Sequence, residues 1–250
     1  MSETLLELRG VTRRFGGLAA TDDVSFALAP GELVGLIGPN GAGKSTLFNL
    51  IAGALLPSAG TIRFEGEDVT ALPAPARCAR GIARTFQVVR SFDSMSVLEN
   101  VVVGALARVA NPRAARRKAH EILDFVDLAS RAERPAGELT MADKRRLEVA
   151  RALATEPRLL LLDEVMTGLT PSEAQRGIDL VRAIRKRGIA ILMVEHVMEI
   201  VMPLVDRAIV LDLGRVLASG RPDALVRDPA VIGAYLGQRR SSSVGHAPGA

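Results

Sequence analysis

Short apolar runs separated by glycine and proline fill the first quarter of the chain. Residues 5–8, 24–28, 33–37 and 61–64 each hold four or five positions that alternate or stay apolar, which is typical of short strands. Strands at this density predict a small antiparallel sheet. The run 33–37 is apolar throughout, which favours a strand that is buried on both faces.

The pattern becomes helical after residue 97 and returns to strand–helix alternation after residue 158. Apolar positions repeat with helix spacing in two segments separated by Asn111-Pro112, at 97–109 and 113–126. Alternation follows, with strands expected at 159–162, 190–194 and 208–211 and a helix at 172–187. This order favours a parallel sheet covered by helices. The small and polar residues of 237–250 predict a disordered tail.

A glycine-rich run lies between the expected strand at 33–37 and an expected helix at 46–52. It fits the phosphate-binding pattern G-x-x-x-x-G-K-[ST], in which glycines turn backbone N–H groups toward an anion and the helix N-terminus adds partial positive charge. Lys44 would reach the outer phosphates, and the Ser45 hydroxyl would hold Mg²⁺. The predicted nucleotide-binding residues are Gly38, Pro39, Asn40, Gly41, Ala42, Gly43, Lys44, Ser45 and Thr46.

Acidic and histidine side chains follow two of the buried strands. Asp163 and Glu164 end the run 159–162, and the carboxyl end of a parallel strand is where ligands bind in such sheets. We predict that Asp163 holds Mg²⁺ through water and that Glu164 orients the attacking water. Glu195-His196 follows the run 190–194, and His196 is predicted to contact the γ-phosphate.

Two further residues have the right chemistry but weaker context. The amide of Gln87 can ligate Mg²⁺ and report its presence to a moving subdomain, although a surface glutamine is the alternative. Phe15 precedes Gly16-Gly17 and can stack on adenine, although a core phenylalanine is the alternative.

Composition places the chain among globular proteins and disfavours several functions. It has 250 residues, 48% of them hydrophobic, with no apolar run long enough for a membrane span. We expect no signal peptide, and the single Cys78 excludes an internal disulfide, which suits a reducing cytosol. The net charge of +4 is compatible with binding to nucleic acid. We do not expect that partner, because the arginines are scattered and few aromatic side chains stand among them for base stacking.

The order and spacing of these motifs over residues 4–236 resemble the ATP-binding cassette (ABC) ATPases. The motifs are the loop 38–46, Gln87, the run Arg145-Arg146-Leu-Glu-Val-Ala-Arg-Ala-Leu, Asp163-Glu164 and Glu195-His196. The resemblance implies an α/β P-loop NTPase fold, with a RecA-like core, an antiparallel β subdomain and an α-helical signature subdomain. It implies one domain over 1–236, divided into 1–90, 91–157 and 158–236. It also implies binding of ATP with Mg²⁺, with Ser45, Gln87 and Asp163 at the metal and Glu164 and His196 as the catalytic residues.

Two stretches, 83–101 and 231–237, look like one of the two cassettes of branched-chain amino-acid importers. This resemblance implies an ATPase at the cytoplasmic face of the inner membrane. Its partners would be a second cassette, two permease subunits and, indirectly, an external binding protein. An importer of amides, urea or another small solute is an alternative, because a cassette does not touch the solute. A soluble cassette acting in ribosome regulation or DNA maintenance is disfavoured, because such proteins usually carry two fused cassettes or a long coiled coil. Whether the two cassettes are identical stays open.

The sequence departs from the family at the signature, the segment that would clamp the γ-phosphate on the opposite subunit. The signature residues here are Leu139, Thr140, Met141, Ala142 and Asp143, where the family usually has Leu-Ser-Gly-Gly-Gln. A carboxylate near a phosphate would cost on the order of 1 kcal/mol even in high dielectric. Asp143 is alternatively expected to cap a helix beginning at Lys144. The departure is compatible with a regulatory cassette that hydrolyses ATP slowly. It is also compatible with a dimer in which the site on this chain's own loop hydrolyses ATP faster than the partner's site. Val165 replaces the family's proline after Glu164, a change expected to be mild, and Thr170 replaces the usual Asp or Asn.

Overall fold

The chain forms two sheets with helices between and around them. The computed structural model describes residues 4–87, 89–195 and 198–241, with side chains to Tyr235. One sheet is antiparallel, in the order β2-β1-β4-β5, and the other has the order β10-β9-β3-β8-β7-β6. Both sheets expected from the apolar pattern are therefore present.

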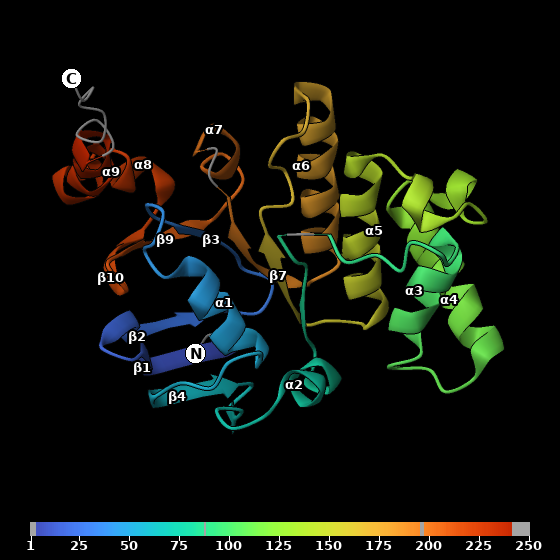
Figure 1. The fold of residues 1–250 in the computed structure, drawn as a ribbon, viewed down its shortest axis with the longest axis horizontal. Helices are drawn as coiled ribbons and strands as arrows, with labels where there is room; N and C mark the ends of the chain where they lie inside the picture. The colour runs from blue at the N-terminus through green and yellow to red at the C-terminus, as the bar shows by residue number, and fades with distance from the viewer. Residues whose placement is uncertain (1–3, 88, 196–197, 242–250) are drawn as a thin grey trace, which may run out of the picture.

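The antiparallel sheet is built from the short strands of the N-terminal region. Its strands are β1 (Leu6–Phe15), β2 (Leu18–Leu28), β4 (Ala59–Phe64) and β5 (Glu67–Asp68). Helix α1 (Lys44–Ala52) lies between this sheet and the central sheet, and one continuous apolar core joins the three layers (Figure 1). The sheet therefore covers one face of the helix that follows the glycine loop.

The central sheet is parallel except at one edge. Its strands are β3 (Leu33–Ile37), β6 (Ile82–Arg84), β7 (Leu159–Asp163), β8 (Ala190–Val194), β9 (Arg207–Asp212) and the antiparallel edge strand β10 (Arg215–Gly220). Every residue of β3, β7 and β8 is buried, as expected for strands with helices on both faces. Because β8 lies between β3 and β7, the carboxyl ends of these three strands meet at one edge.

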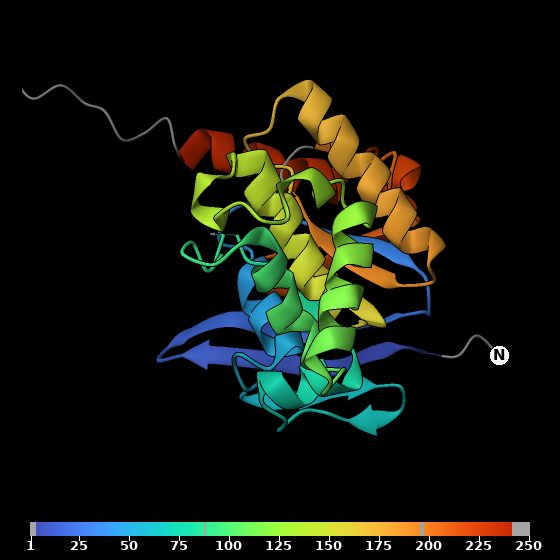
Figure 2. The same cartoon turned by 90° about the vertical axis from the view of Figure 1, so that its right-hand side faces the viewer.

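The helices cover the second face of the central sheet and form a separate lobe. The lobe contains α3 (Val97–Ala105), α4 (Pro112–Phe125), η1 (Ala129–Arg131), η2 (Ala136–Glu138) and α5 (Met141–Ala154). Figure 2 shows it in green and yellow toward the viewer, with α6 (Pro171–Lys186) above it. The remaining helices are α2 (Ala74–Arg80), α7 (Met198–Val201), α8 (Pro222–Leu225) and α9 (Pro229–Ser241). No helix in the described ranges is long and apolar enough to cross a bilayer.

Helix starts follow their sequence signals. Ser96 and Glu99 form a capping box at α3, and Thr170 and Glu173 form another at α6, so the first N–H groups of each helix have side-chain acceptors. Asn111 caps α4, which begins at Pro112. The predicted separation of two helices at Asn111-Pro112 is confirmed.

A buried arginine closes the other end of α1. Arg77 is fully buried and donates to the carbonyl oxygens of Leu50 at 2.5 Å and Ile51 at 2.9 Å, at the end of α1. Burial lowers the pKa of Arg77 to about 10. A cation at a helix C-terminus is favourable, because the last carbonyls have no partner within the helix. Arg77 therefore fixes the helix that follows the glycine loop.

The structure differs from the sequence prediction at the ends of the domain. Helix α9 continues to Ser241, so the expected disordered tail from residue 237 is wrong for 237–241, whose backbone is helical. Residues 242–250 lie outside the described ranges. Strands β6 and β10 and helix α2 had no counterpart in the predicted elements.

Candidate nucleotide site

The glycine loop lies between β3 and α1 and is held tightly from outside. Gly38 has φ +146°, and a Cβ there would stand 2.1 Å from the Leu211 carbonyl oxygen on β9. Gly43 has φ +101°, and a Cβ there would stand 2.3 Å from the Ala20 carbonyl oxygen. Neither position tolerates a side chain, because the contacts are with backbone atoms. At Gly41, by contrast, φ is +80° and no atom lies within 4 Å of an added Cβ.

Lys44 opens α1 and turns its ammonium back onto the loop. Its Nζ donates to the carbonyl oxygens of Gly38 at 2.7 Å and Pro39 at 2.9 Å. Burial lowers the pKa of Lys44, and the charges of Glu164 and Asp163 oppose that shift. Gly43, at the N-cap, offers no side chain to the first N–H groups of α1. A desolvated ammonium beside a helix N-terminus without a side-chain cap is suited to bind an anion.

The loop forms the wall of an open depression of about 640 Å³. The lining comes from the loop, the start of β2, the β9–β10 turn and two of the predicted polar residues: Leu18, Ala19, Ala20, Asn40, Gly41, Ala42, Gly43, Lys44, Ser45, Thr46, Gln87, Glu164 and Leu213. Leu18 and Leu213 are strongly exposed and give the rim an apolar surface that the sequence analysis did not assign. In the sequence, the only sign of this surface is that each leucine stands at a hairpin turn, where an apolar residue is unusual. The size of the depression is that of an ordinary small-ligand site.

Phe15 does not line this depression. Its ring is half exposed at the end of β1, and the Arg13 guanidinium lies 4.8 Å from the ring centroid. The neighbouring Leu18 lines the depression instead. Stacking of Phe15 on adenine stays a prediction.

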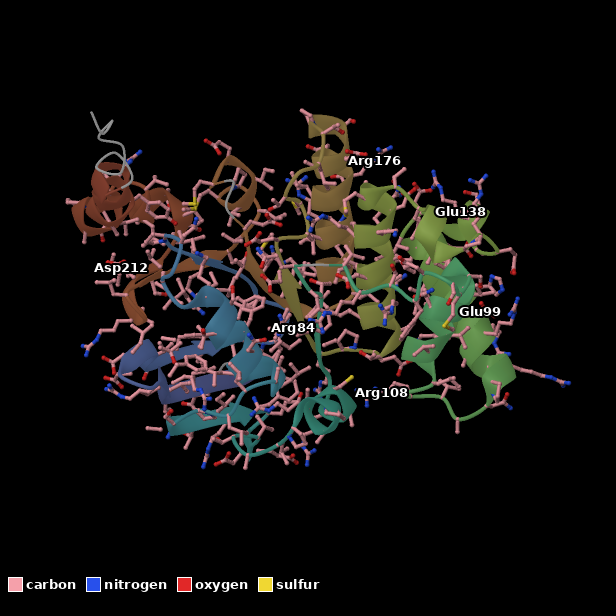
Figure 3. The ribbon with its side chains drawn as sticks, in the orientation of Figure 1. Arg84, Glu99, Arg108, Glu138, Arg176 and Asp212 are labelled. Carbon is pink, nitrogen blue, oxygen red and sulfur yellow. The ribbon has the colours of Figure 1, made fainter. Side chains whose placement is uncertain are left out.

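Asp163 does not line the depression and forms an ion pair. Its Oδ2 accepts from Arg84 Nη2 at 3.2 Å, and its backbone N–H donates to Thr85 Oγ1 at 3.0 Å. Arg84 also donates to Asn49 Oδ1 on α1 at 2.6 Å, and Figure 3 places it between α1 and β7. Arg84 therefore ties the acidic strand to the phosphate-loop helix, a role that no sequence pattern indicated.

Gln87 and Glu164 meet at the edge of the depression. Gln87 Nε2 donates to Glu164 Oε2 at 3.0 Å. Glu164 has φ +52°, an uncommon conformation for a residue with a side chain, and its N–H donates to the Val194 carbonyl at 2.9 Å. Of the three predicted Mg²⁺ ligands, Ser45 and Gln87 line the depression and Asp163 does not. The hydroxyl, amide and carboxylate oxygens are of the type that Mg²⁺ prefers.

His196 lies outside the described residues, but its neighbour Glu195 is placed. Glu195 is buried, and its carboxylate accepts the Met166 N–H at 2.8 Å and the Thr167 hydroxyl at 3.4 Å. Burial raises the pKa of Glu195 to about 7, and the charge of Glu164 adds to that shift. Glu195 therefore holds the loop that follows Glu164, a function that its place in the sequence did not reveal.

The signature segment begins α5 and does not line the depression. Thr140 is the N-cap and its hydroxyl accepts the Asp143 N–H at 3.2 Å, so Asp143 is not the cap and the helix begins at Met141, not Lys144. Asp143 is 3% exposed, and its carboxylate pairs with Arg146 and, at 3.2 Å, with Arg131 Nε. The expected negative charge at the signature surface is therefore wrong, because two guanidinium groups neutralise the carboxylate inside the protein.

A phosphate-binding loop, a buried lysine and a glutamate at a parallel strand end are thus gathered at one edge of the sheet. Residues 21–167 match the family model described as ABC transporter. The chain belongs to this family, and the predicted ABC fold and ATP hydrolysis are confirmed. Residues 215–240 match a second model, described as branched-chain amino acid ATP-binding cassette transporter.

Among curated proteins, the chain is similar to high-affinity branched-chain amino acid transport ATP-binding proteins. It is 39% identical to BraF of Pseudomonas aeruginosa and 39% identical to LivG of Escherichia coli K12, over 95% of this chain and 100% of each relative. It is 32% identical to a probable LivG of Methanocaldococcus jannaschii, over 94% of this chain and 98% of that protein.

Solved structures show the same fold. The ADP conformation of an ATP-binding cassette from an ABC transporter superposes with a TM-score of 0.85 at 32% identity, covering 94% of this chain and 99% of that one. A nucleotide-free cassette gives the same TM-score and identity, covering 93% and 98%.

Proposed function

We propose that this chain is the ATP-hydrolysing cassette of an importer for branched-chain or other neutral amino acids. One observation carries the catalytic part: Lys44, Gln87 and Glu164 line the same depression as the glycine loop. The substrate class is supported by relatives that are named as branched-chain amino acid transport ATP-binding proteins and match the chain over nearly its whole length.

The residues of the depression have distinct roles in this proposal. The loop 38–46 binds the phosphates of ATP through backbone N–H groups and Lys44. Ser45, Gln87 and Asp163 would hold Mg²⁺, which would supply neutralisation of the phosphate charge. Glu164 orients the attacking water, because its carboxylate lies at the edge of the depression, within 3.0 Å of the Gln87 amide. His196 contacts the γ-phosphate.

The site on this chain is open and needs a second subunit. The signature residues 139–143 do not line the chain's own depression, which agrees with a role at a partner's nucleotide. We therefore propose a pair of cassettes beneath two permease subunits at the cytoplasmic face of the inner membrane, supplied by an external binding protein. The regulatory alternative loses support, because Asp143 is paired inside the protein and would not repel a partner's phosphate.

Glu164→Gln tests the catalytic assignment. The amide retains the hydrogen-bonding shape but cannot accept a proton, so we expect ATP turnover to fall at least about 100-fold while ATP binding persists. Glu99→Gln, the same change in the helical lobe, is the control and should hydrolyse ATP at the parent rate. Parent-like turnover of Glu164→Gln would show that another group orients the water.

Uptake tests the substrate class. The chain would be expressed with its permease and binding-protein partners, and uptake of labelled leucine, acetamide and urea would be compared with and without Glu164→Gln. Leucine uptake that Glu164→Gln abolishes supports the proposal. Uptake of acetamide or urea alone contradicts the amino-acid assignment and leaves the ATPase assignment intact.

A further inference from the structure

One buried carboxylate attaches the loop around Gln87 to helix α5. Glu148 lies on α5 and is 6% exposed. Its Oε2 accepts the Phe86 N–H at 3.2 Å, and its Oε1 accepts the Arg90 N–H at 2.8 Å. The two donors stand on either side of Gln87 in the sequence. Both oxygens of Glu148 are therefore engaged with the backbone that carries Gln87.

The backbone passes from the sheet to the helical lobe between Thr85 and Phe86. Thr85 belongs to the sheet, because its N–H donates to the Leu161 carbonyl at 2.9 Å and its hydroxyl accepts the Asp163 N–H at 3.0 Å. Phe86 lies on the helical side, because its N–H donates to Glu148, on α5.

The rest of the loop is also bound to the helical lobe. Asn100 on α3 accepts the Phe92 N–H at 2.9 Å and donates to the Phe92 carbonyl at 3.0 Å. Arg151 on α5 donates to the Arg90 carbonyl. Gln87 thus lies on the helical side of the boundary, while its amide reaches back to the strand end that carries Glu164.

Helix α5 also contacts the partner of Gln87. Arg145 precedes Glu148 by three positions, so both side chains leave the same face of α5. Arg145 Nη1 donates to the backbone oxygen of Glu164. One face of α5 therefore supports both members of the Gln87–Glu164 hydrogen bond.

We propose that Glu148 is a positioning residue for ATP hydrolysis, because it holds the backbone of Phe86 and Arg90 on α5 and so places the Gln87 amide against Glu164. The proposal rests on the proposed function, in which Glu164 orients the attacking water. Burial raises the pKa of Glu148, because it makes the charged carboxylate less favourable. The charge-assisted hydrogen bonds from the two N–H groups offset part of this cost of burial.

Glu148→Gln removes one of the two acceptors, because the side-chain NH₂ cannot accept from a backbone N–H. Glu99→Gln is the matched control. Glu99 lies in the same lobe and accepts the Ser96 N–H at the start of α3 at 2.7 Å, far from Arg84 in Figure 3. We expect Glu148→Gln to lower kcat for ATP in the full-length chain about tenfold, with KM within about twofold, because the phosphate loop is untouched. Glu99→Gln should change neither. A parent-like kcat for Glu148→Gln overturns the proposal.

A double-variant cycle separates positioning from general stability. If Glu148 acts through Gln87, adding Glu148→Gln to Gln87→Ala causes no further loss of kcat. If the two losses multiply, Glu148 acts by another route and the proposal is wrong. Hydrogen exchange of the Phe86 and Arg90 amides should be faster in Glu148→Gln and unchanged in Glu99→Gln, and equal protection in the two variants also overturns the proposal. Failure of the proposed function looks different, because Gln87→Ala and Glu164→Gln would themselves leave hydrolysis intact.

Discussion

The buried charge of Asp143 makes a quantitative prediction for Asp143→Asn. The carboxylate contacts Arg146, whose side chain is 17% exposed, and Arg131, whose side chain is 37% exposed. Removing one partner of a buried ion pair typically costs about 3–5 kcal/mol. Arg146 keeps a second partner, Asp127, at 3.0 Å, and Arg131 is partly solvated, so we expect about 2–3 kcal/mol. In a domain of this size that corresponds to a fall in Tm of roughly 5–10 °C.

Thermal unfolding and ATP turnover, measured on the same preparation, test this prediction. Asp179→Asn is the control, because Asp179 forms an exposed pair with Arg182 at 3.4 Å and such pairs contribute about 0–1 kcal/mol. A carboxylate facing a partner's phosphate would behave in the opposite way. Its removal would relieve about 1 kcal/mol of repulsion and speed turnover about fivefold with little loss of stability. An unchanged Tm with faster hydrolysis would refute the buried pairing.

Three further variants follow from the site. Glu195 has its pKa raised from 4.5 to about 7, so the folded state keeps the proton and this group's contribution to stability is full below pH 4.5 and is lost as the pH rises through about 7. Glu195→Gln should remove this dependence of stability on pH, as measured by denaturant unfolding across pH 5–8. Above pH 7 the variant should be more stable than the parent by up to about 3 kcal/mol, and parallel pH curves for the two proteins contradict the prediction. Lys44→Met should lose ATP binding in a fluorescent-nucleotide titration yet stay folded, because it removes a desolvated charge; retained binding contradicts the site. Gly38→Ala should lose at least about 3 kcal/mol of unfolding free energy through its clash with the Leu211 carbonyl, whereas Gly17→Ala, with open space, should stay within about 0.5 kcal/mol, and equal losses contradict the packing at Gly38.

The sequence predicted the parts of the fold that local pattern determines. The run 33–37 and the loop 38–46 could be placed because a buried strand, glycines at fixed spacing and a helix are all local signals. The three residues of β6 were missed, because Ile82–Arg84 is too short to show a period and is a strand only by pairing with β7.

The roles in the site that the sequence did not reveal depend on contacts between residues that are remote in sequence. An aspartate such as Asp143 is expected to be exposed, and its burial depends on Arg131, which comes from η1. The pKa of Glu195 is raised by burial and by the charge of Glu164, and both act only in the folded chain. Arg84 has its role through Asn49, which lies on α1 and 35 positions away in the sequence. Contacts of this kind depend on the direction in which each side chain points, which can be known only from the tertiary structure.

The strand order also determines when during synthesis this protein can first bind its nucleotide. Strand β3 ends at Ile37, but its two neighbours in the sheet are β8 and β9, residues 190–194 and 207–212. The Leu211 carbonyl against which Gly38 rests is therefore among the last parts of the domain to leave the ribosome. Long-range parallel pairing forms slowly, and a ligand stabilises only the state that binds it. Cellular ATP therefore cannot assist the nascent chain until nearly the whole domain has emerged, and chains released before residue 207 should be left to chaperones and proteases.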